Sequence, residues 1–243
     1  MRTATLLFFL LYFASSGVSQ PSDTINTSKG KLIIHFLGHG TLMFEFNGKI
    51  IHIDPYSKIA DYTTLPKADL ILITHQHPDH LDSSALASIY KPTTSVYWTQ
   101  QCAKESKYKV SAKIMSNGDK CIWNGILIEA VPAYNIVNKR QNGTPYHQFG
   151  EGNGYILSIY GMRIYVAGDT ENIPEMLRYR PIYIAFLPVN LPYTMTPEMF
   201  KDAALMIDPK ILYPYHTGKT DTALLPELLK ENPSIQVRIR KMD

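Results

Sequence analysis

Residues 74–82, with the sequence THQHPDHLD, constrain this chain more than any other stretch. They follow directly on the apolar run at residues 70–73, and branched apolar residues in a short run are typical of a buried β-strand. Three imidazoles and a carboxylate crowd together at the end of a core strand chiefly when they hold a cation. A solvated polar loop is the alternative, but four potential ligands within six residues favour a metal site. The candidate ligands are His75, His77, Asp79 and His80.

The spacing of these residues indicates two sites rather than one. His75 and His77 are two residues apart, so both rings can turn to one side of the departing chain while Asp79 and His80 face the other. Such a presentation suits two cations about 3.5–4 Å apart, which can share a bridging water.

The pattern His75-x-His77-x-Asp79-His80 resembles the signature of the metallo-β-lactamase superfamily, whose members are mostly hydrolytic enzymes. The resemblance extends over residues 31–239. It implies an α/β fold, a four-layer αββα sandwich in which two mixed sheets face each other, helices cover the outside and strand-end loops meet along one edge.

Two later strands also end in candidate ligands. The apolar run at residues 162–166 leads to Asp169, and the run at residues 211–215 leads to His216. The resemblance implies that Asp169 bridges the two cations and that His216 completes the second site with Asp79 and His80. Several true β-lactamases carry cysteine or serine where this chain has Asp169, so antibiotic hydrolysis is disfavoured.

The chain departs from the family pattern at one position. The resemblance implies a third histidine of the first site after the strand that ends near residue 131, but Asn135 stands there. An amide oxygen is a weaker zinc ligand than an imidazole, so the first site is either weak, differently filled or completed by another residue. His147, in the following loop, is the candidate substitute, and a loop histidine without a ligand role is the alternative.

Five other residues are candidates for supporting roles. His39 lies between two glycines, Asp54 follows a strand, and the resemblance implies that both support the ligands from behind. Tyr134, Tyr193 and Thr194 lie in loops that follow apolar strands and are candidates for substrate contact. For the loop of Tyr193 and Thr194 an ordinary structural role is favoured.

Short β-branched and aromatic runs alternate with helical patterns, which predicts helices outside and strands inside. Asn-Gly at residues 47–48 and 124–125 predicts two tight hairpins, and Asp82 is placed to cap a helix through residues 85–89. Further strands are expected at residues 32–37, 41–46, 49–53, 95–98, 120–123, 126–131, 155–160, 183–188 and 236–239, and helices at residues 100–107, 197–207 and 223–229.

The chain ends and composition set its organisation. Residues 1–19 have one arginine, an apolar core of about ten residues and then small residues, which is typical of a secretory signal peptide. Residues 20–30 are expected to be a loose polar lead-in, and residues 31–243 one domain. The sequence thus predicts a secreted or periplasmic protein with no transmembrane segment in its mature chain. Its oligomeric state is left open.

The net charge and the two cysteines bear on nucleic-acid binding and on disulfide formation. The net charge of +3 and the lack of a Lys/Arg run give no reason to expect nucleic-acid binding. Cys102 and Cys121 could form a disulfide in an exported protein or stay free.

The expected chemistry is hydrolysis of a small-molecule substrate. One or two divalent ions are implied, zinc by default for nitrogen and oxygen ligands, with manganese or iron as alternatives. They would activate water for attack on an ester, lactone or phosphodiester, as in the lactonase and N-acyl-phosphatidylethanolamine phospholipase D branch that the chain resembles. Asp79 is the candidate to orient the water and protonate the leaving group. The alternative is a catalytically weak metal-binding member with a sensing or scaffold role.

Overall fold

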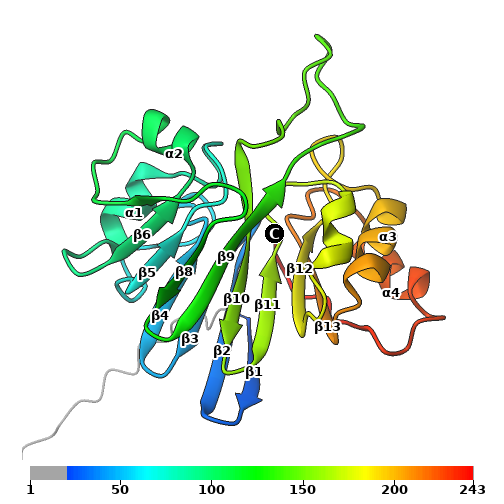
Figure 1. The fold of residues 1–243 in the computed structure, drawn as a ribbon, viewed down its shortest axis with the longest axis horizontal. Helices are drawn as coiled ribbons and strands as arrows, with labels where there is room; N and C mark the ends of the chain where they lie inside the picture. The colour runs from blue at the N-terminus through cyan, green and yellow to red at the C-terminus, as the bar shows by residue number, and fades with distance from the viewer. Residues whose placement is uncertain (1–20, 243) are drawn as a thin grey trace, which may run out of the picture.

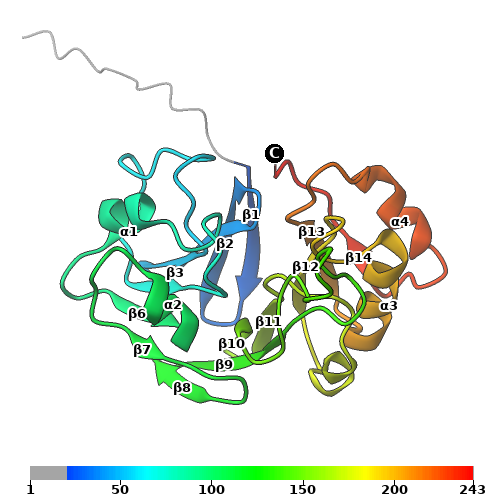
Figure 2. The same cartoon turned by 90° about the horizontal axis from the view of Figure 1, so that it is seen from above.

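The computed structural model describes residues 21–242, so the signal peptide predicted at residues 1–19 lies outside the described residues. Two seven-stranded mixed sheets face each other, with α1 and α2 outside one sheet and α3 and α4 outside the other, as Figures 1 and 2 show. This is the predicted αββα sandwich.

The first sheet contains, in spatial order, β1 (Ser22–Thr27), β2 (Gly30–Gly38), β3 (Thr41–Phe46), β4 (Lys49–Ile53), β5 (Leu70–Leu72), β6 (Ser95–Trp98) and β7 (Lys113–Ile114). The second contains β8 (Lys120–Trp123), β9 (Ile126–Ala133), β10 (Gly152–Ile159), β11 (Met162–Val166), β12 (Ile184–Pro188), β13 (Ile211–Tyr215) and β14 (Gln236–Val237), also in chain order. The helical elements are α1 (Ser83–Ile89), α2 (Gln100–Glu105), the 3-10 turn η1 (Pro174–Arg178), α3 (Pro197–Ile207), the 3-10 turn η2 (Thr222–Leu224) and α4 (Leu225–Leu228).

The two halves repeat one topology. In each, four strands form an antiparallel meander, and the fourth begins a parallel run with the next three. The carboxyl ends of the parallel strands lie at the same edge of each sheet, which is where the ligand-bearing loops begin.

The core has three layers of apolar contact, one between the sheets and one beneath each outer pair of helices. Between the sheets, Phe36 of β2 packs on Tyr213 of β13 with ring centroids 5.0 Å apart, and Phe186 of β12 stacks on Tyr213 at 5.1 Å. These rings fix the distance between the sheets and hence between ligands that come from different halves.

The predicted turns and cap are confirmed. Asn47 and Gly48 both have positive φ, 48° and 68°, as do Asn124 and Gly125 at 45° and 78°, which is the geometry of a type I′ hairpin. The carboxylate of Asp82 accepts hydrogen bonds from the first turn of α1.

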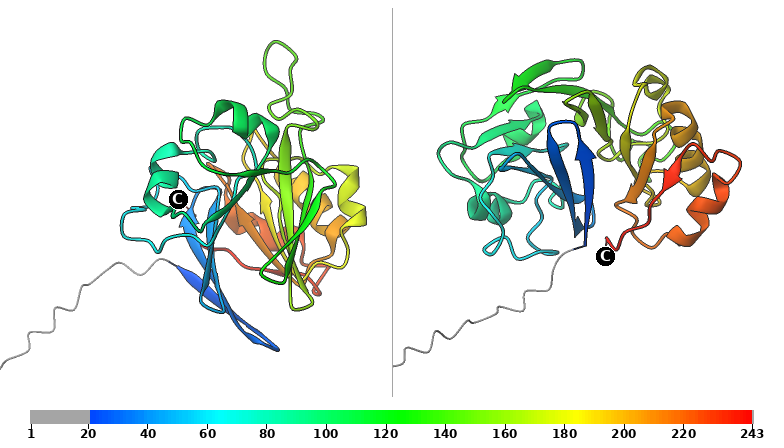
Figure 3. Two further views of the ribbon diagram at one scale, coloured as in Figure 1. Left: turned by 60° about the vertical axis from the view of Figure 1, so that its left-hand side comes forward. Right: turned by 90° about the horizontal axis from the view of Figure 1, so that it is seen from below.

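Residues 22–27 were wrongly predicted to be loose. They form β1, which pairs antiparallel with β2, and Figure 3 shows this hairpin beside the C-terminal end of the chain. Only Ile25 of the strand is buried. An edge strand can expose most of its side chains, so polar composition alone did not reveal it.

Cys102 and Cys121 are both free. Cys102 is the buried residue of α2, while Cys121 lies half-buried on β8. None of the helices formed by the described residues is long and apolar enough to cross a lipid bilayer.

Candidate metal centre

The predicted ligands gather at the edge where the parallel strands end, the upper edge of the sheets in Figure 1. Asp54 follows β4, the 74–82 motif follows β5, Asp169 follows β11 and His216 follows β13. The turn between β2 and β3 adds His39, and the loop between β9 and β10 adds His147. Segments far apart in sequence therefore meet because strand order places their ends together.

His75, His77 and His147 form the first group of potential ligands. The Nδ1 atom of His77 lies 3.0 Å from Nε2 of His75 and 3.2 Å from Nε2 of His147. A tetrahedral zinc ion with Zn–N bonds of about 2.0–2.1 Å would hold its ligand atoms about 3.3 Å apart. His147 thus stands where the family pattern led us to expect a histidine and the sequence offered Asn135.

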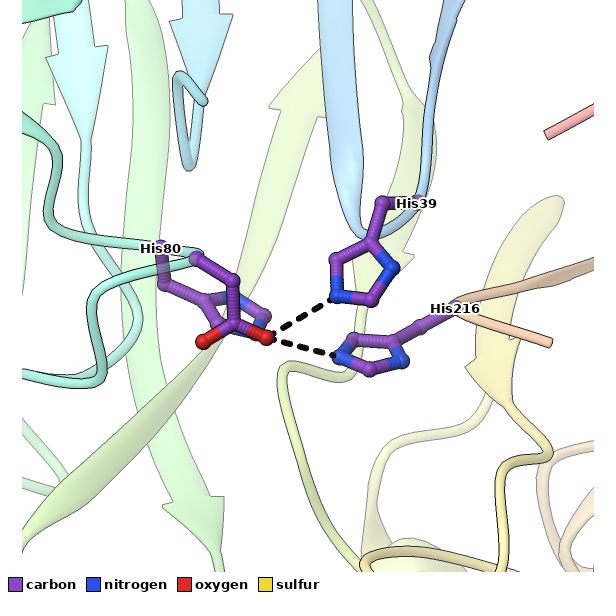
Figure 4. A group of neighbouring side chains, drawn as sticks. His39, His80 and His216 are labelled. Carbon is purple, nitrogen blue, oxygen red and sulfur yellow. Dashed lines mark hydrogen bonds and ion pairs between the residues drawn. The ribbon is translucent and has the colours of Figure 1, made fainter. Parts of the chain in front are cut away.

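His39, Asp79, His80 and His216 form the second group. Figure 4 shows the rings of His39, His80 and His216 converging from three segments of the chain. Oδ2 of Asp79 lies 2.9 Å from Nε2 of His39, 3.6 Å from Nε2 of His216 and 3.7 Å from Nε2 of His80.

The carboxylate of Asp169 lies between the two groups. Its Oδ2 is 3.3 Å from Nε2 of His147 and 4.0 Å from Nε2 of His75, on the side of the first group. On the other side Oδ2 is 3.5 Å from Nε2 of His216, and Oδ1 is 3.6 Å from Nε2 of His80. This is the position from which one carboxylate can reach two cations.

Three buried donor atoms at this centre have no hydrogen-bond partner within the part of the chain that the structure describes: Nε2 of His80, Nε2 of His216 and Oδ1 of Asp169. A buried polar atom without a partner is costly, and a cation that accepts their lone pairs removes that cost. The donor set, imidazole nitrogens and carboxylate oxygens, is also the set that zinc and similar ions prefer. The residues therefore fit a divalent metal ion.

Asp54 supports the ligands from behind, as the sequence led us to expect. It is fully buried, accepts hydrogen bonds from the backbone N–H of Thr74 at 2.7 Å and from its hydroxyl at 2.6 Å, and accepts the Nδ1–H of His80 at 2.9 Å. Oγ1 of Thr74 is in turn 3.0 Å from Nδ1 of His75. A partner at Nδ1 leaves Nε2 of each ring free for a metal.

Asn135 plays the same part for His147. Its Oδ1 accepts hydrogen bonds from both Nδ1 and the backbone N–H of His147, at 2.7 Å and 2.9 Å. Its Nδ2 donates to Oε1 of Glu171 at 3.1 Å and to the carbonyl of Tyr193 at 2.9 Å. The amide oxygen is thereby turned toward the histidine and holds Nε2 of His147 on the cluster.

The charges of the centre favour a bound cation. Burial lowers the pKa of His77 to about 4, with His147 acting in the same direction, and burial together with His80 lowers the pKa of His75 well below its usual value. Both rings are neutral at neutral pH, the form that ligates metals. Burial lowers the pKa of His80 too, but the carboxylates of Asp169 and Asp54 outweigh it and raise that pKa to about 10.

The carboxylates themselves remain ionised. Burial raises the pKa of Asp169, but His216, His80 and His147 outweigh it and hold the pKa well below its usual range. In the same way His216 and His39 overcome burial and lower the pKa of Asp79.

The backbone at the centre is unusual. His39, Asp54 and His216 have positive φ values of 51°, 48° and 46°, a conformation that non-glycine residues adopt at a cost. Gly40 makes room, because a Cβ there would lie 2.9 Å from Cε1 of His80 and 3.1 Å from Cδ2 of His216.

A cavity of about 380 Å³ opens above the cluster. Tyr193, a candidate substrate contact, lines it. Thr194 is fully buried, and its hydroxyl accepts from the backbone N–H of Asn190, which agrees with the structural role favoured for that loop. Tyr134 points elsewhere: its hydroxyl donates to Glu175 and its ring packs edge-on against Phe149. The cavity lining comprises His39, His77, Pro78, Asp79, Arg140, Tyr146, His147, Asp169, Asn190, Tyr193 and His216.

Sequence reasoning missed four residues of this region. Thr74 lies inside the central motif, and Glu171 lies two residues after Asp169, so their neighbours offered a signal. Asn190, whose amide is 3.2 Å from Nδ1 of His216, and Arg140 come from loops with no pattern that marks them.

Comparison with known proteins agrees with this geometry. A family model described as the beta-lactamase superfamily domain matches residues 33–216, so the chain belongs to that superfamily, as its motif suggested. A protein of Pelotomaculum thermopropionicum named UPF0173 metal-dependent hydrolase is 31% identical over 193 residues, 75% of this chain and 83% of that protein.

Solved structures show the same relationship. A crystal structure described as a metal-dependent hydrolase from Parabacteroides distasonis is 46% identical with a TM-score of 0.86, covering 92% of this chain and all (100%) of that one. A metallo hydrolase from Ignicoccus hospitalis, 21% identical with a TM-score of 0.70 and covering 87% of this chain and 95% of its own, shares the fold.

Proposed function

We propose that this protein is a metal-dependent hydrolase that cleaves an ester, lactone or phosphodiester bond in a small molecule. The observation that carries the proposal is the set of buried donor atoms of His80, His216 and Asp169 that have no hydrogen-bond partner among residues 21–242, beside a cavity that His216 and Asp169 line. The similarity to proteins named metal-dependent hydrolases supports it.

The ligand roles follow from the two groups. His75, His77 and His147 would hold one ion, and Asp79, His80 and His216 the other, while His39 of the second group donates its Nε2–H to Asp79. Asp169 would contact both ions. We propose zinc for both positions because the donors are nitrogen and oxygen atoms, while manganese and iron accept the same donors. When bound, such ions lower the pKa of water toward 7 and polarise a carbonyl or phosphoryl oxygen.

The chain's own contribution to proton transfer falls to Asp79. Its carboxylate lines the cavity, with 33% of the side chain exposed, and His39 donates from Nε2 to its Oδ2. That oxygen can take a proton from the attacking water and return it to the leaving oxygen as the substrate bond breaks. No serine or cysteine is present among the described residues that line the cavity, so water is the proposed nucleophile.

The alternative of a catalytically weak metal-binding protein was motivated by Asn135 at the position of a ligand. The placement of His147 in the first group weakens that motivation, because three imidazoles are present there. We therefore favour the enzyme.

Metal content and turnover test the proposal together. Purified protein would be assayed for bound metal by mass spectrometry and offered panels of lactones, phosphodiesters and thioesters, alongside His77→Ala and the control His35→Ala, a histidine of β2 outside the centre. We expect His77→Ala to lose at least about 100-fold in kcat/KM, more than the loss of an outer partner, and His35→Ala to keep wild-type activity. Equal rates for wild type and His77→Ala would remove the hydrolase proposal.

We also propose that the protein is exported, on the pattern of residues 1–19. Cleavage before Gln20 would leave β1, which begins at Ser22, complete. Mass spectrometry of the protein recovered outside the cytoplasm should give a mature chain that starts near Gln20, and an uncleaved Met1 would contradict the proposal.

A further inference from the structure

The loop between β9 and β10 forms one wall of the cavity and rises above the sheets in Figure 1. It folds back on itself as a small hairpin: Lys139 and Pro145 form a β-bridge, the N–H of Arg140 donates to the carbonyl of Thr144 at 2.8 Å, and the N–H of Gly143 donates to the carbonyl of Arg140 at 2.9 Å. The backbone of Arg140 is therefore held in place.

A buried carboxylate fixes this hairpin to the metal centre. Glu171 is fully buried, and it accepts the backbone N–H groups of Ile136, Val137 and Asn138 at 2.7, 2.8 and 2.7 Å. Because Glu171 follows Asp169 by two residues, one short segment positions both the candidate bridging ligand and the loop that carries Arg140.

The side chain of Arg140 is exposed and lies against an aromatic ring of the cavity wall. Its guanidinium lies over the ring of Tyr146, 5.0 Å from the centroid, and Tyr146 packs edge-on against Tyr193 with ring centroids 5.0 Å apart. All three residues line the cavity. A guanidinium stacked on an aromatic ring still presents its N–H groups in its own plane.

Among residues 21–242 no Asp or Glu oxygen lies within ion-pair distance of the Arg140 guanidinium. Arg178 also has no such partner, but unlike Arg140 it does not line the cavity. The bond of the Arg140 side chain within this part of the chain is a long one, 3.4 Å, from Nη2 to the carbonyl of Tyr146. A planar fork of donors without an acidic partner, on the wall of the cavity beside the candidate ligands, matches the bidentate geometry of a carboxylate or phosphate.

We propose that Arg140 binds an anionic substituent of the substrate, a carboxylate or phosphate adjacent to the bond that is cleaved. This inference rests on the proposed hydrolase function and specifies its substrate class. Arg140 is then a specificity-determining residue: it holds the substrate's charged group, while the bond to be cleaved faces the cluster of imidazoles and carboxylates below.

The test compares matched substrates that differ in charge alone. Each ester or lactone found active would be prepared in pairs, with a free carboxylate or phosphate beside the cleaved bond and with that group neutralised, the carboxylate as its methyl ester and the phosphate as its dimethyl ester. Arg140→Met removes the charge but keeps most of the apolar stem, Arg140→Lys keeps the charge without the fork, and Lys139→Met is the control, since Lys139 is the adjacent cation on the same hairpin and does not line the cavity.

We expect Arg140→Met to lower kcat/KM by about 10- to 100-fold for the anionic member of a pair, and by less than about twofold for the neutral member. Arg140→Lys should fall between, and Lys139→Met should match wild type. A larger effect on carboxylate or on phosphate pairs identifies which anion is native. Equal losses on both members of the pairs, or wild-type preference for the neutral members, would overturn the inference.

A binding measurement separates this inference from the proposed function. Calorimetric titration of the metal-loaded protein with inorganic phosphate, and separately with acetate, should show at least one of the two binding about tenfold more weakly to Arg140→Met than to wild type, whatever the turnover. If wild type hydrolyses no substrate but shows that difference, the hydrolase proposal fails and the anion site stands. If both anions bind the two proteins equally, the anion site fails.

Discussion

Asn135 occupies a position where the family pattern predicts a ligand, yet it supports one instead. Its amide is fixed by Glu171 and by the carbonyl of Tyr193, so that Oδ1 faces His147. Asn135 therefore does not contact the metal position itself. It holds His147, which lies twelve residues later in the chain, in the position of the ligand. The absence of a histidine at the position where the family pattern predicts one does not by itself mean that the metal site is lost.

Asn135→Ala should weaken metal binding without removing a ligand. The Nδ1–H of His147 loses its acceptor, and outer partners of ligating histidines are typically worth about 10- to 100-fold in metal affinity. Competition with a chromogenic chelator would measure the change. The control is Asn138→Ala, on the same loop, whose amide donates to the carbonyl of Thr194 and touches no candidate ligand. An unchanged affinity in Asn135→Ala would show that His147 needs no such support.

The loop between β9 and β10 depends on one buried acid for its conformation. Glu171 accepts hydrogen bonds from three consecutive backbone N–H groups of the loop and from the side-chain amide of Asn135. These bonds fix the base of the loop, although the loop projects from the sheets. A connection with this many fixed donors acts as part of the site rather than as a linker.

Glu171→Gln should loosen this loop. Glutamine offers one acceptor oxygen in place of two and turns an NH₂ group toward backbone donors, and each buried donor left unpaired costs about 1–3 kcal/mol. Trypsin cleavage after Lys139 and Arg140, followed by mass spectrometry, should become faster. Glu175→Gln is the matched control, because Glu175 accepts from the hydroxyl of Tyr134 and from none of the loop's N–H groups. Identical cleavage rates in the two variants would contradict the role of Glu171.

The first strand and the last residues of the chain are joined by charge. Asp23 of β1 receives Nη2 of Arg240 at 2.7 Å, Nε of Arg240 at 2.8 Å and the hydroxyl of Tyr213 at 2.5 Å. Burial raises the pKa of Asp23, but these hydrogen bonds outweigh it and hold the pKa below its usual value. The contact links the two sheets, because Asp23 belongs to β1 and Tyr213 to β13.

Asp23→Asn should therefore reduce stability in a pH-dependent way. A carboxylate whose pKa is lower in the folded state contributes stability that is complete above its unfolded pKa, about 3.9, and that is lost as the pH falls through the folded pKa. We expect the variant to be less stable by about 1–2 kcal/mol at neutral pH, and the difference to shrink below about pH 4. Urea unfolding at a series of pH values would measure it, with Asp202→Asn on α3 as control. A difference that persists undiminished at low pH would rule out the ionised carboxylate as its source.

Removing metal should destabilise the whole molecule, since the candidate ligands come from both sheets. An ion present at about 100 times its dissociation constant stabilises the folded state by about 2.7 kcal/mol. Thermal melts after dialysis against a chelator should show a lower Tm that added zinc restores, while His77→Ala should show a smaller change. An unchanged Tm after dialysis against the chelator would argue against bound ions at this centre.

The sequence predicted the parts of the site that strand ends determine. Asp169 and His216 could be found because an apolar strand leads to each, and His75 to His80 because they crowd into one motif. The bond from Asn135 to His147 and the position of Arg140 depend on how a loop folds over the sheets, which no local pattern encodes. For Thr194 the sequence left a structural role and a substrate contact open, and the burial of its side chain supports the structural role. The edge strand β1 was not predicted, because most of its side chains face solvent and its sequence is therefore polar.

Both groups of potential ligands straddle the boundary between the two repeated halves. His75, His77, Asp79 and His80 precede β7, whereas His147, Asp169 and His216 follow β8. A cation at either position would therefore cross-link the half of the molecule that contains β1–β7 to the half that contains β8–β14. Any shear of one half against the other would disturb both coordination spheres at once, so release of the two ions and separation of the halves should be a single cooperative event.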